Sequence, residues 1–87
     1  MKKLVTNFPC VIGRKGGDFN VPGDQHISGR HVEISVRDNK FFITDLESRN
    51  GTFIGEKRLS PGTPTMLNGS TIVSLGRRTR LKLEPQA

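Results

Sequence analysis

Tryptophan and tyrosine are absent from this 87-residue sequence, and cysteine occurs only once. The core must therefore come from aliphatic residues and phenylalanine, and the single Cys10 excludes an internal disulfide. No paired cysteines and histidines have the spacing of a zinc site, and Asn7 and Pro9 interrupt the amino terminus before a signal peptide could form. No run approaches the roughly 20 apolar residues of a membrane span. We therefore expect a cytoplasmic protein without membrane insertion, metal or cofactor.

Acidic residues are also scarce, with eight Asp and Glu against fourteen Lys and Arg. The formal net charge of +6 favours an anionic partner, which could be nucleic acid, acidic lipid or a phosphorylated protein. Composition alone does not choose among the three.

Helical periodicity is missing, since no ten consecutive residues keep it, whereas a period of two is clear in residues 31–37. There Val32, Ile34 and Val36 share one face, and His31, Glu33, Ser35 and Arg37 share the other. Asp38-Asn39 is a plausible tight turn, and residues 40–46 return as a second strand. The pattern predicts an antiparallel hairpin.

Other short strands are expected along the chain, separated by turns rich in glycine and proline. They lie at residues 4–8, 10–12, 52–54, 71–75 and 80–83. Many short strands at close intervals predict an all-β fold, an antiparallel β-sandwich in a single domain.

Three polar turns follow or precede these strands: Gly13-Arg14, Ser28-Gly29-Arg30-His31 and Ser48-Arg49-Asn50-Gly51. Loops gather at the two ends of a sandwich, so the three turns could converge. Together they supply guanidinium groups, a hydroxyl, an amide and backbone N–H groups. A dianionic phosphate, with three strong acceptor oxygens, requires such donors.

Two enzymatic interpretations of these turns are weak. Ser28, His31 and Asp45 contain the residue types of a hydrolase triad, but Ser28 lacks a strained nucleophile elbow. Residues 13–17 are glycine-rich like a nucleotide-binding loop, yet they lack the Gly-Lys-Ser/Thr ending and a following helix. We therefore expect no enzyme activity.

A basic cluster near the carboxyl end, formed by Arg77, Arg78, Arg80 and Lys82, has two interpretations. Charged side chains on an edge strand protect it from aggregation. The alternative is a patch for nucleic acid or an acidic partner.

The three turns resemble the sparse signature of the forkhead-associated (FHA) domain family, which is Gly-Arg, then Ser-x-x-His, then Asn-Gly. The residues around Asp18-Phe19, 45–54 and 67–72 are also similar to the family pattern in order and spacing. The resemblance covers nearly the whole of residues 1–87, as one FHA domain that is either a whole protein or a piece of a longer one. It implies an FHA-type sandwich of about eleven strands that binds phosphothreonine in partner proteins, with a Ser/Thr kinase upstream in signalling.

The resemblance also implies roles for individual residues. Arg14 would fork onto the phosphate, and Ser28 would donate its hydroxyl to another phosphate oxygen. Asn50 would hold the peptide backbone beside the phosphothreonine, and Arg49 would reach the backbone or the phosphate. Gly13, His31 and Gly51 would be structural support.

One position departs from the family pattern. The residue after the serine is often Arg, Lys or Asn in the family and contacts the phosphate, whereas here it is Gly29. Its backbone N–H remains, and Arg30, Lys15 or Arg49 would substitute for the missing side chain. The alternative is an FHA-type adaptor or assembly domain that binds without phosphate.

Overall fold

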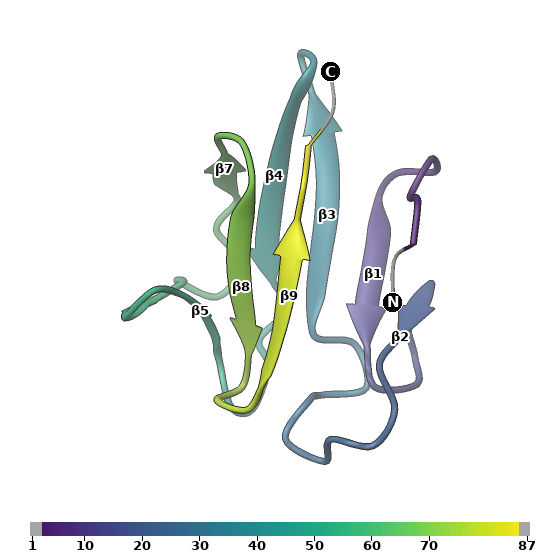
Figure 1. The fold of residues 1–87 in the computed structure, drawn as a ribbon, viewed down its shortest axis with the longest axis vertical. Helices are drawn as coiled ribbons and strands as arrows, with labels where there is room; N and C mark the ends of the chain where they lie inside the picture. The colour runs from purple at the N-terminus through teal and green to yellow at the C-terminus, as the bar shows by residue number, and fades with distance from the viewer. Residues whose placement is uncertain (1–2, 86–87) are drawn as a thin grey trace.

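Two β-sheets pack face to face in the computed structural model, which describes residues 3–85 (Figure 1). The sheet orders are β2-β1-β3-β4-β7 and β6-β5-β8-β9. The strands are β1 (Cys10–Gly13), β2 (Phe19–Asn20), β3 (Val32–Arg37), β4 (Lys40–Asp45), β5 (Thr52–Ile54), β6 (Lys57–Arg58), β7 (Thr65–Leu67), β8 (Thr71–Leu75) and β9 (Thr79–Leu83). Within residues 3–85 the structure has no helix able to span a membrane. The predicted all-β sandwich is confirmed.

The β3–β4 hairpin is the longest pairing and was predicted correctly. Six residues pair in register, from Val32 with Asp45 to Arg37 with Lys40. Asp38 and Asn39 form the turn with φ of 53° and 63°. Positive φ at both central residues characterises the turn that matches the right-handed twist of paired strands, and Asp and Asn tolerate it better than most residues.

The core lies between the sheets and contains no side chain larger than leucine among its buried members. They are Cys10, Ile12, Ile27, Val32, Ile34, Ile43, Leu59, Leu67, Val73 and Leu75. Two core residues lie outside the strands: Leu59, which follows β6, and Ile27, which belongs to the β2–β3 loop and is 1 % exposed. A loop residue thus contributes to the core.

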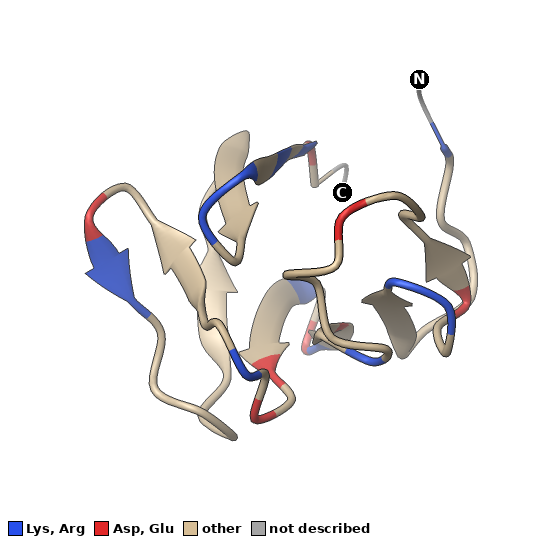
Figure 2. Cartoon of the chain, turned by 90° about the horizontal axis from the view of Figure 1, so that it is seen from below, with Lys and Arg blue, Asp and Glu red and all other residues tan. Residues whose placement is uncertain are grey.

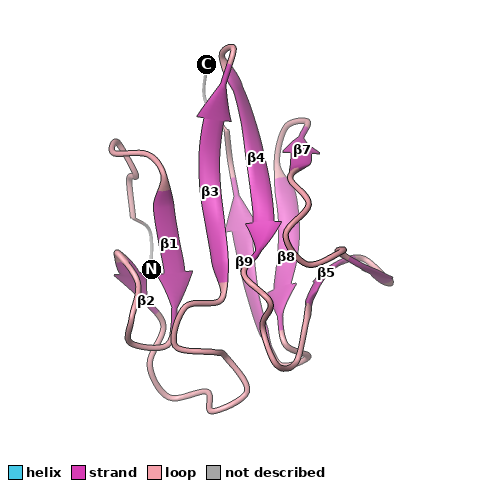
Figure 3. Ribbon diagram, turned by 180° about the vertical axis from the view of Figure 1, so that it is seen from behind, coloured by secondary structure: helices cyan, strands magenta, loops and turns pink. Residues whose placement is uncertain are grey.

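The β2–β3, β4–β5 and β8–β9 connections lie at one end of the sandwich, the lower end in Figures 1 and 3. Strand β1 also ends there, and the β3–β4 turn lies at the opposite end. The topology therefore brings the predicted polar turns to the same end of the molecule.

Three expectations about the strands are corrected. Residues 3–85 contain nine strands, fewer than the predicted eleven, and no strand forms at residues 4–8. In that segment Leu4 is 81 % exposed, and Val5 packs against the core. The five-stranded sheet is also not wholly antiparallel, because β1 and β2 pair in parallel.

The predicted alternation in β3 fails at both ends of residues 31–37. Val36, expected to be buried, is 41 % exposed, because it lies near the tip of the β3–β4 hairpin, which the other sheet does not cover. His31, expected on the polar face, is fully buried just before the strand begins. Its backbone N–H donates to the Ile12 carbonyl, which fixes it beside β1.

Substitution of Ile43 by alanine tests the core. Ile43 is 0 % exposed in the middle of β4, so the shorter side chain leaves a cavity. We expect a loss of about 2–5 kcal/mol in the free energy of unfolding, measured by urea denaturation. Ile72→Ala is the matched control, because Ile72 is 58 % exposed and should lose less than about 1 kcal/mol. Equal losses would contradict the assigned core.

Candidate functional site

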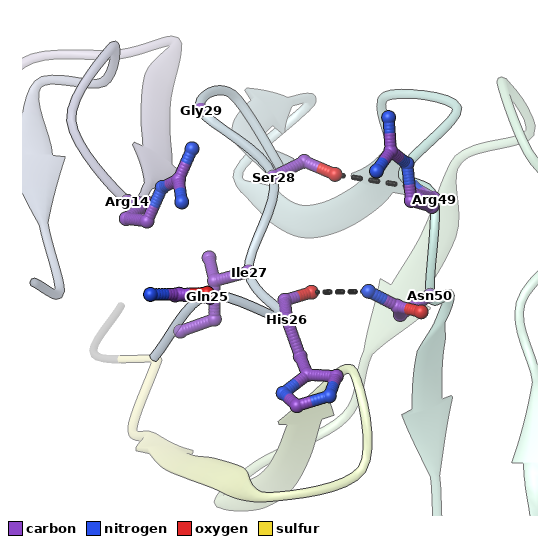
Figure 4. A pocket seen from close by; sticks show the side chains of 8 residues that line it. All are labelled: Arg14, Gln25, His26, Ile27, Ser28, Gly29, Arg49 and Asn50. Atoms are coloured by element: carbon purple, nitrogen blue, oxygen red, sulfur yellow. Dashed lines mark hydrogen bonds between the residues drawn. The ribbon is translucent and has the colours of Figure 1, made fainter. Parts of the chain in front are cut away.

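A polar pocket of about 350 Å³ opens between the converging loops (Figure 4). Its lining comes from the end of β1, the β2–β3 loop and the β4–β5 loop: Arg14, Gln25, His26, Ile27, Ser28, Gly29, Arg49 and Asn50. The predicted residues Arg14, Ser28, Gly29, Arg49 and Asn50 are thus brought together. Among the described residues that line it, no side chain is a carboxylate.

The pocket wall begins where the end of β1 meets the β2–β3 loop. The Arg14 N–H donates to the Ser28 carbonyl at 2.9 Å, and the Gly16 N–H donates to the Gly29 carbonyl at 2.9 Å. A Cβ on Gly13 would overlap the Gly29 carbonyl. Glycine is therefore required at position 13 for the two backbones to approach this closely.

His31 joins the second and third turns from beneath. Its Nδ1 accepts the Ser28 N–H at 3.0 Å, and its Nε2 donates to the Gly51 carbonyl at 2.8 Å. These two bonds define a neutral imidazole protonated on Nε2. Burial lowers the pKa of His31 below its ordinary 6.5, although the Gly51 carbonyl and the charges of Asp45 and Asp24 act in the opposite direction.

The third turn is held by a buried network that the sequence interpretation missed. The Asp45 carboxylate accepts the Ser48 and Thr52 hydroxyls, each at 2.6 Å, and the Ser48 N–H at 3.1 Å. The Ser48 oxygen in turn accepts the Gly51 N–H at 3.0 Å. Gly51 has φ of 86°, which favours glycine. The sequence shows these residues with the spacing Asp-x-x-Ser-x-x-x-Thr, but this spacing does not predict that they are buried.

The side chains at the rim are partly engaged and partly free. The Ser28 oxygen accepts the Arg49 N–H at 3.1 Å, which leaves the hydroxyl hydrogen as a donor. The Asn50 amide nitrogen donates to the His26 carbonyl at 2.8 Å, which leaves the amide oxygen as an acceptor. Both bonds are drawn in Figure 4 and connect the β2–β3 loop with the β4–β5 loop.

Arg14 carries an unpaired donor. Its side chain is half-buried, and its buried Nε has no hydrogen-bond partner within residues 3–85. Leaving a buried donor unpaired costs roughly 1–3 kcal/mol, so such groups are rare in native proteins. Arg14 also lines the pocket, where no carboxylate among the described lining residues neutralises its charge.

Two predicted auxiliary residues, Lys15 and Arg30, are exposed and do not line the pocket. The Arg30 stem lies against Gly16, and Gly29 faces open space, because a Cβ at its position would meet no atom within 4 Å. Gln25, His26 and Ile27 line the pocket but were not predicted. Their position in the same loop as Ser28 was the available signal.

Asp24 ties this loop to the second sheet. Its carboxylate accepts the Thr79 hydroxyl at 2.6 Å, the His26 N–H at 2.9 Å and the His26 Nδ1 at 3.2 Å. The Thr79 hydrogen bond is the main reason that the pKa of Asp24 is lowered, followed by the bonds from His26. Thr79 begins β9, so the four-stranded sheet also positions the pocket.

The geometry does not assemble a hydrolase triad. His31 bonds the Ser28 backbone N–H and the Gly51 carbonyl, not the Ser28 hydroxyl. Asp45 bonds Ser48 and Thr52, not His31. The imidazole is therefore a brace between loops.

Loops fixed at one end of a β-sandwich, with donors around an open pocket, define a recognition domain. Comparison with protein families identifies it further: the FHA domain model matches residues 10–76, and the chain belongs to the FHA domain family. The resemblance seen in the three turns is confirmed.

Individual relatives agree with this assignment. The chain is 36 % identical over 81 residues to a chloroplastic zeaxanthin epoxidase of Nicotiana plumbaginifolia, across 80 % of this chain and 12 % of the epoxidase. An FHA domain of the CT664 protein from Chlamydia trachomatis superposes with a TM-score of 0.77 at 26 % identity, over 97 % of this chain and 82 % of that one. A structure from a study of phosphothreonine-dependent FHA domain interactions has a TM-score of 0.75 at 25 % identity, over 94 % and 83 %. The chain spans from 12 % to 48 % of the lengths of curated relatives that it matches.

Acidification should destabilise the domain through His31. Because the folded-state pKa lies below the unfolded value near 6.5, the unfolded chain binds more protons below that pH. The stabilising contribution is complete above pH 6.5 and is lost as the pH falls through the folded-state pKa. Urea denaturation should record this fall, at no more than about 1.4 kcal/mol per pH unit.

Substitutions of the two histidines separate this effect from other titrations. His31→Gln should be less stable than wild type at pH 7.5 and should lose the pH dependence between 7.5 and 5. His26→Gln leaves the hydrogen bonds of His31 intact and should keep the pH dependence of stability. A flat wild-type profile over this range would contradict the buried neutral imidazole.

Proposed function

We propose that this domain binds phosphothreonine-containing segments of partner proteins in the pocket of Figure 4. The observation that carries the proposal is that Arg14 lines a pocket together with Ser28, Gly29 and Asn50, and that this lining, among the described residues, has no carboxylate. The family assignment and the related phosphothreonine-dependent FHA structure support it. The net charge of +6 adds a long-range attraction for a dianion.

The available donors suggest how a phosphate would bind. Arg14 would place its guanidinium fork on two phosphate oxygens. Ser28 would donate its free hydroxyl hydrogen, and the Gly29 backbone N–H would supply a further donor. Phosphate binding would therefore draw on two of the three loops.

The third loop would hold the peptide. The Asn50 amide oxygen, free while its nitrogen bonds His26, would accept a backbone N–H of the ligand. Arg49 is exposed at the rim and would reach the phosphate or the ligand backbone. Lys15 and Arg30 lie outside the pocket lining and would contribute by charge more than by direct contact.

We propose that the domain acts without catalysis, since Ser28, His31 and Asp45 are engaged in bonds that hold the loops. Its partner would be the product of a threonine-phosphorylating kinase, and the proposed location is the cytoplasm. The buried free thiol of Cys10, whose pKa is raised by burial, fits a reducing compartment. Residues 1–87 would act as one FHA domain, alone or within a longer protein.

Calorimetric titration with matched threonine and phosphothreonine peptides tests the proposal. The phosphorylated peptide should bind at least about tenfold more tightly, since it adds charge-assisted hydrogen bonds worth about 1.5–3 kcal/mol each. Equal affinity for both peptides would instead support the phosphate-independent adaptor.

Arg14→Ala tests the assigned anchor. Loss of one charge-assisted bond should weaken phosphopeptide binding roughly 10- to 150-fold while the domain stays folded. Arg37→Ala is the matched control, because Arg37 is exposed at the far end of β3 and should bind like wild type. An Arg14 variant with unchanged affinity would show that the phosphate lies elsewhere.

Gly29→Arg should strengthen binding. Position 29 faces open space and its φ lies outside the range that favours glycine, so a side chain fits without strain. A guanidinium there would add an exposed charge-assisted contact, worth roughly 3- to 10-fold in affinity. Gly29→Ala controls for the backbone and should leave affinity near wild type. No gain from arginine would mean that position 29 does not face the phosphate.

A further inference from the structure

A row of side chains crosses the outer face of the four-stranded sheet, and its Arg58 end lies beside Gly51, next to the third turn. Arg58 of β6 pairs with Phe53 of β5, Phe53 pairs with Ser74 of β8, and Ser74 pairs with Arg80 of β9. Residues directly opposite in a sheet point to the same face. This face is the outer one, because the alternate residues Val73 and Leu75 are buried in the core. We refer to these four residues as the basic row.

More positive charge surrounds the basic row. Lys82 pairs with Ile72 in the next row of the same face, and the Arg77 guanidinium lies 5.2 Å from the Phe53 ring centroid. The Arg58 guanidinium lies 5.9 Å from the same centroid. Figure 2 shows the blue β6 on one side of β5 and β8, and the blue β8–β9 turn and β9 on the other.

No carboxylate lies within ion-pair distance of these cations in residues 3–85, where the one contact between a carboxylate and a basic side chain within that distance joins Asp24 and His26 at the pocket. Arg58, Arg77, Arg80 and Lys82 are all exposed and contribute four like charges to one face. Arg80 and Lys82 lie two residues apart on the same face of β9, and Arg77 lies in the turn before this strand, so an anionic partner would relieve the repulsion among these charges.

We propose that this outer face is a second binding surface, which takes an acidic segment of a partner protein. Arginine forks match carboxylates in bidentate geometry. Arg58 and Arg80 are separated by three strand spacings, about 14 Å, and carboxylates four residues apart in an extended peptide are separated by about the same distance. Ile72, which is 58 % exposed beside the row, would contact an apolar side chain between them.

A protein segment fits this face better than a nucleic acid. Single-stranded nucleic acids need free aromatic faces on which bases stack. The Phe53 ring is half-buried and already contacts two guanidiniums. A nucleic-acid phosphate backbone offers no apolar group that the exposed Ile72 could contact. The proposal does not depend on the phosphothreonine function, because the row includes no residue of the pocket.

The test is an NMR titration of the ¹⁵N-labelled domain with an unphosphorylated peptide containing Glu-Ser-Leu-Ser-Glu, at about 0.15 M salt to limit non-specific attraction. Amide signals of Phe53, Ser74 and Arg80 should shift, and those of Ser28 and Asn50 should not. The double substitution Arg58→Glu with Arg80→Glu should weaken binding about tenfold or more.

The matched control is Arg37→Glu with Lys40→Glu. Arg37 and Lys40 are exposed cations on neighbouring strands of the other sheet, and their double substitution changes the net charge equally. The control should lose no more than about twofold in affinity. The two double variants lower the net charge equally, so they should bind a phosphothreonine peptide about equally well. Arg14→Ala should bind the acidic peptide as wild type does.

Several results would overturn the proposal. Equal losses in the two double variants would mean that net charge alone attracts the peptide. Shifts confined to the pocket loops, or weakened acidic-peptide binding in Arg14→Ala, would assign the peptide to the phosphate pocket. A single-stranded DNA that shifts Phe53, Ser74 and Arg80 at lower concentration than the peptide would make this a nucleic-acid surface.

Discussion

The pocket depends on one buried imidazole. His31 accepts the Ser28 N–H with one ring nitrogen and donates to the Gly51 carbonyl with the other, so two loops separated by twenty residues are held at a fixed distance. Protonation would place a second N–H against the Ser28 N–H and break the first bond. Because the ring is fully buried, its neutral form is also the one that burial favours. The arrangement of the loops therefore requires an uncharged histidine. The positions of Ser28, Arg49 and Asn50 at the pocket rim depend on this arrangement.

Much of the fold was predictable because local chemistry was strong. The alternation of β3 and β4 and the Asp38-Asn39 turn specified a hairpin without reference to the rest of the chain, and the three polar turns were recognisable at strand ends. Strand β7 was not predictable, since Thr65–Leu67 has three residues, follows Pro64, and is a strand only through its pairing with β4. The burial of His31 and the Asp45 network were hidden for the same reason: both depend on what the opposite sheet covers. Gln25 and His26 enter the pocket through the path of an irregular loop, which no periodic pattern encodes.

The molecule separates its two kinds of polar surface. At the loop end, hydrogen bonds between the turns already hold the backbone donors, a hydroxyl and a half-buried guanidinium in place. A ligand would therefore lose little affinity to the ordering of these groups. On the outer face of the four-stranded sheet, the arginines of the basic row are exposed, long and without ion-pair partners among the described residues. The first surface suits a compact dianion, and the second suits carboxylates spread along an extended chain. Thr79 and Asp24 connect the two sheets between these regions.

Ile27 has a further consequence for the dynamics of the pocket. Its side chain belongs to the core although its backbone belongs to the β2–β3 loop, next to Ser28. Withdrawing this loop from the sandwich would expose a buried isoleucine, which adds about 1.5–3 kcal/mol to the free energy of a large loop opening. Amide hydrogens around Ser28 and His31 would then exchange with solvent more slowly than those of a loop without a core residue. Occupancy of the pocket would in turn raise the melting temperature of the whole domain, because any ligand held by this loop binds the folded state alone.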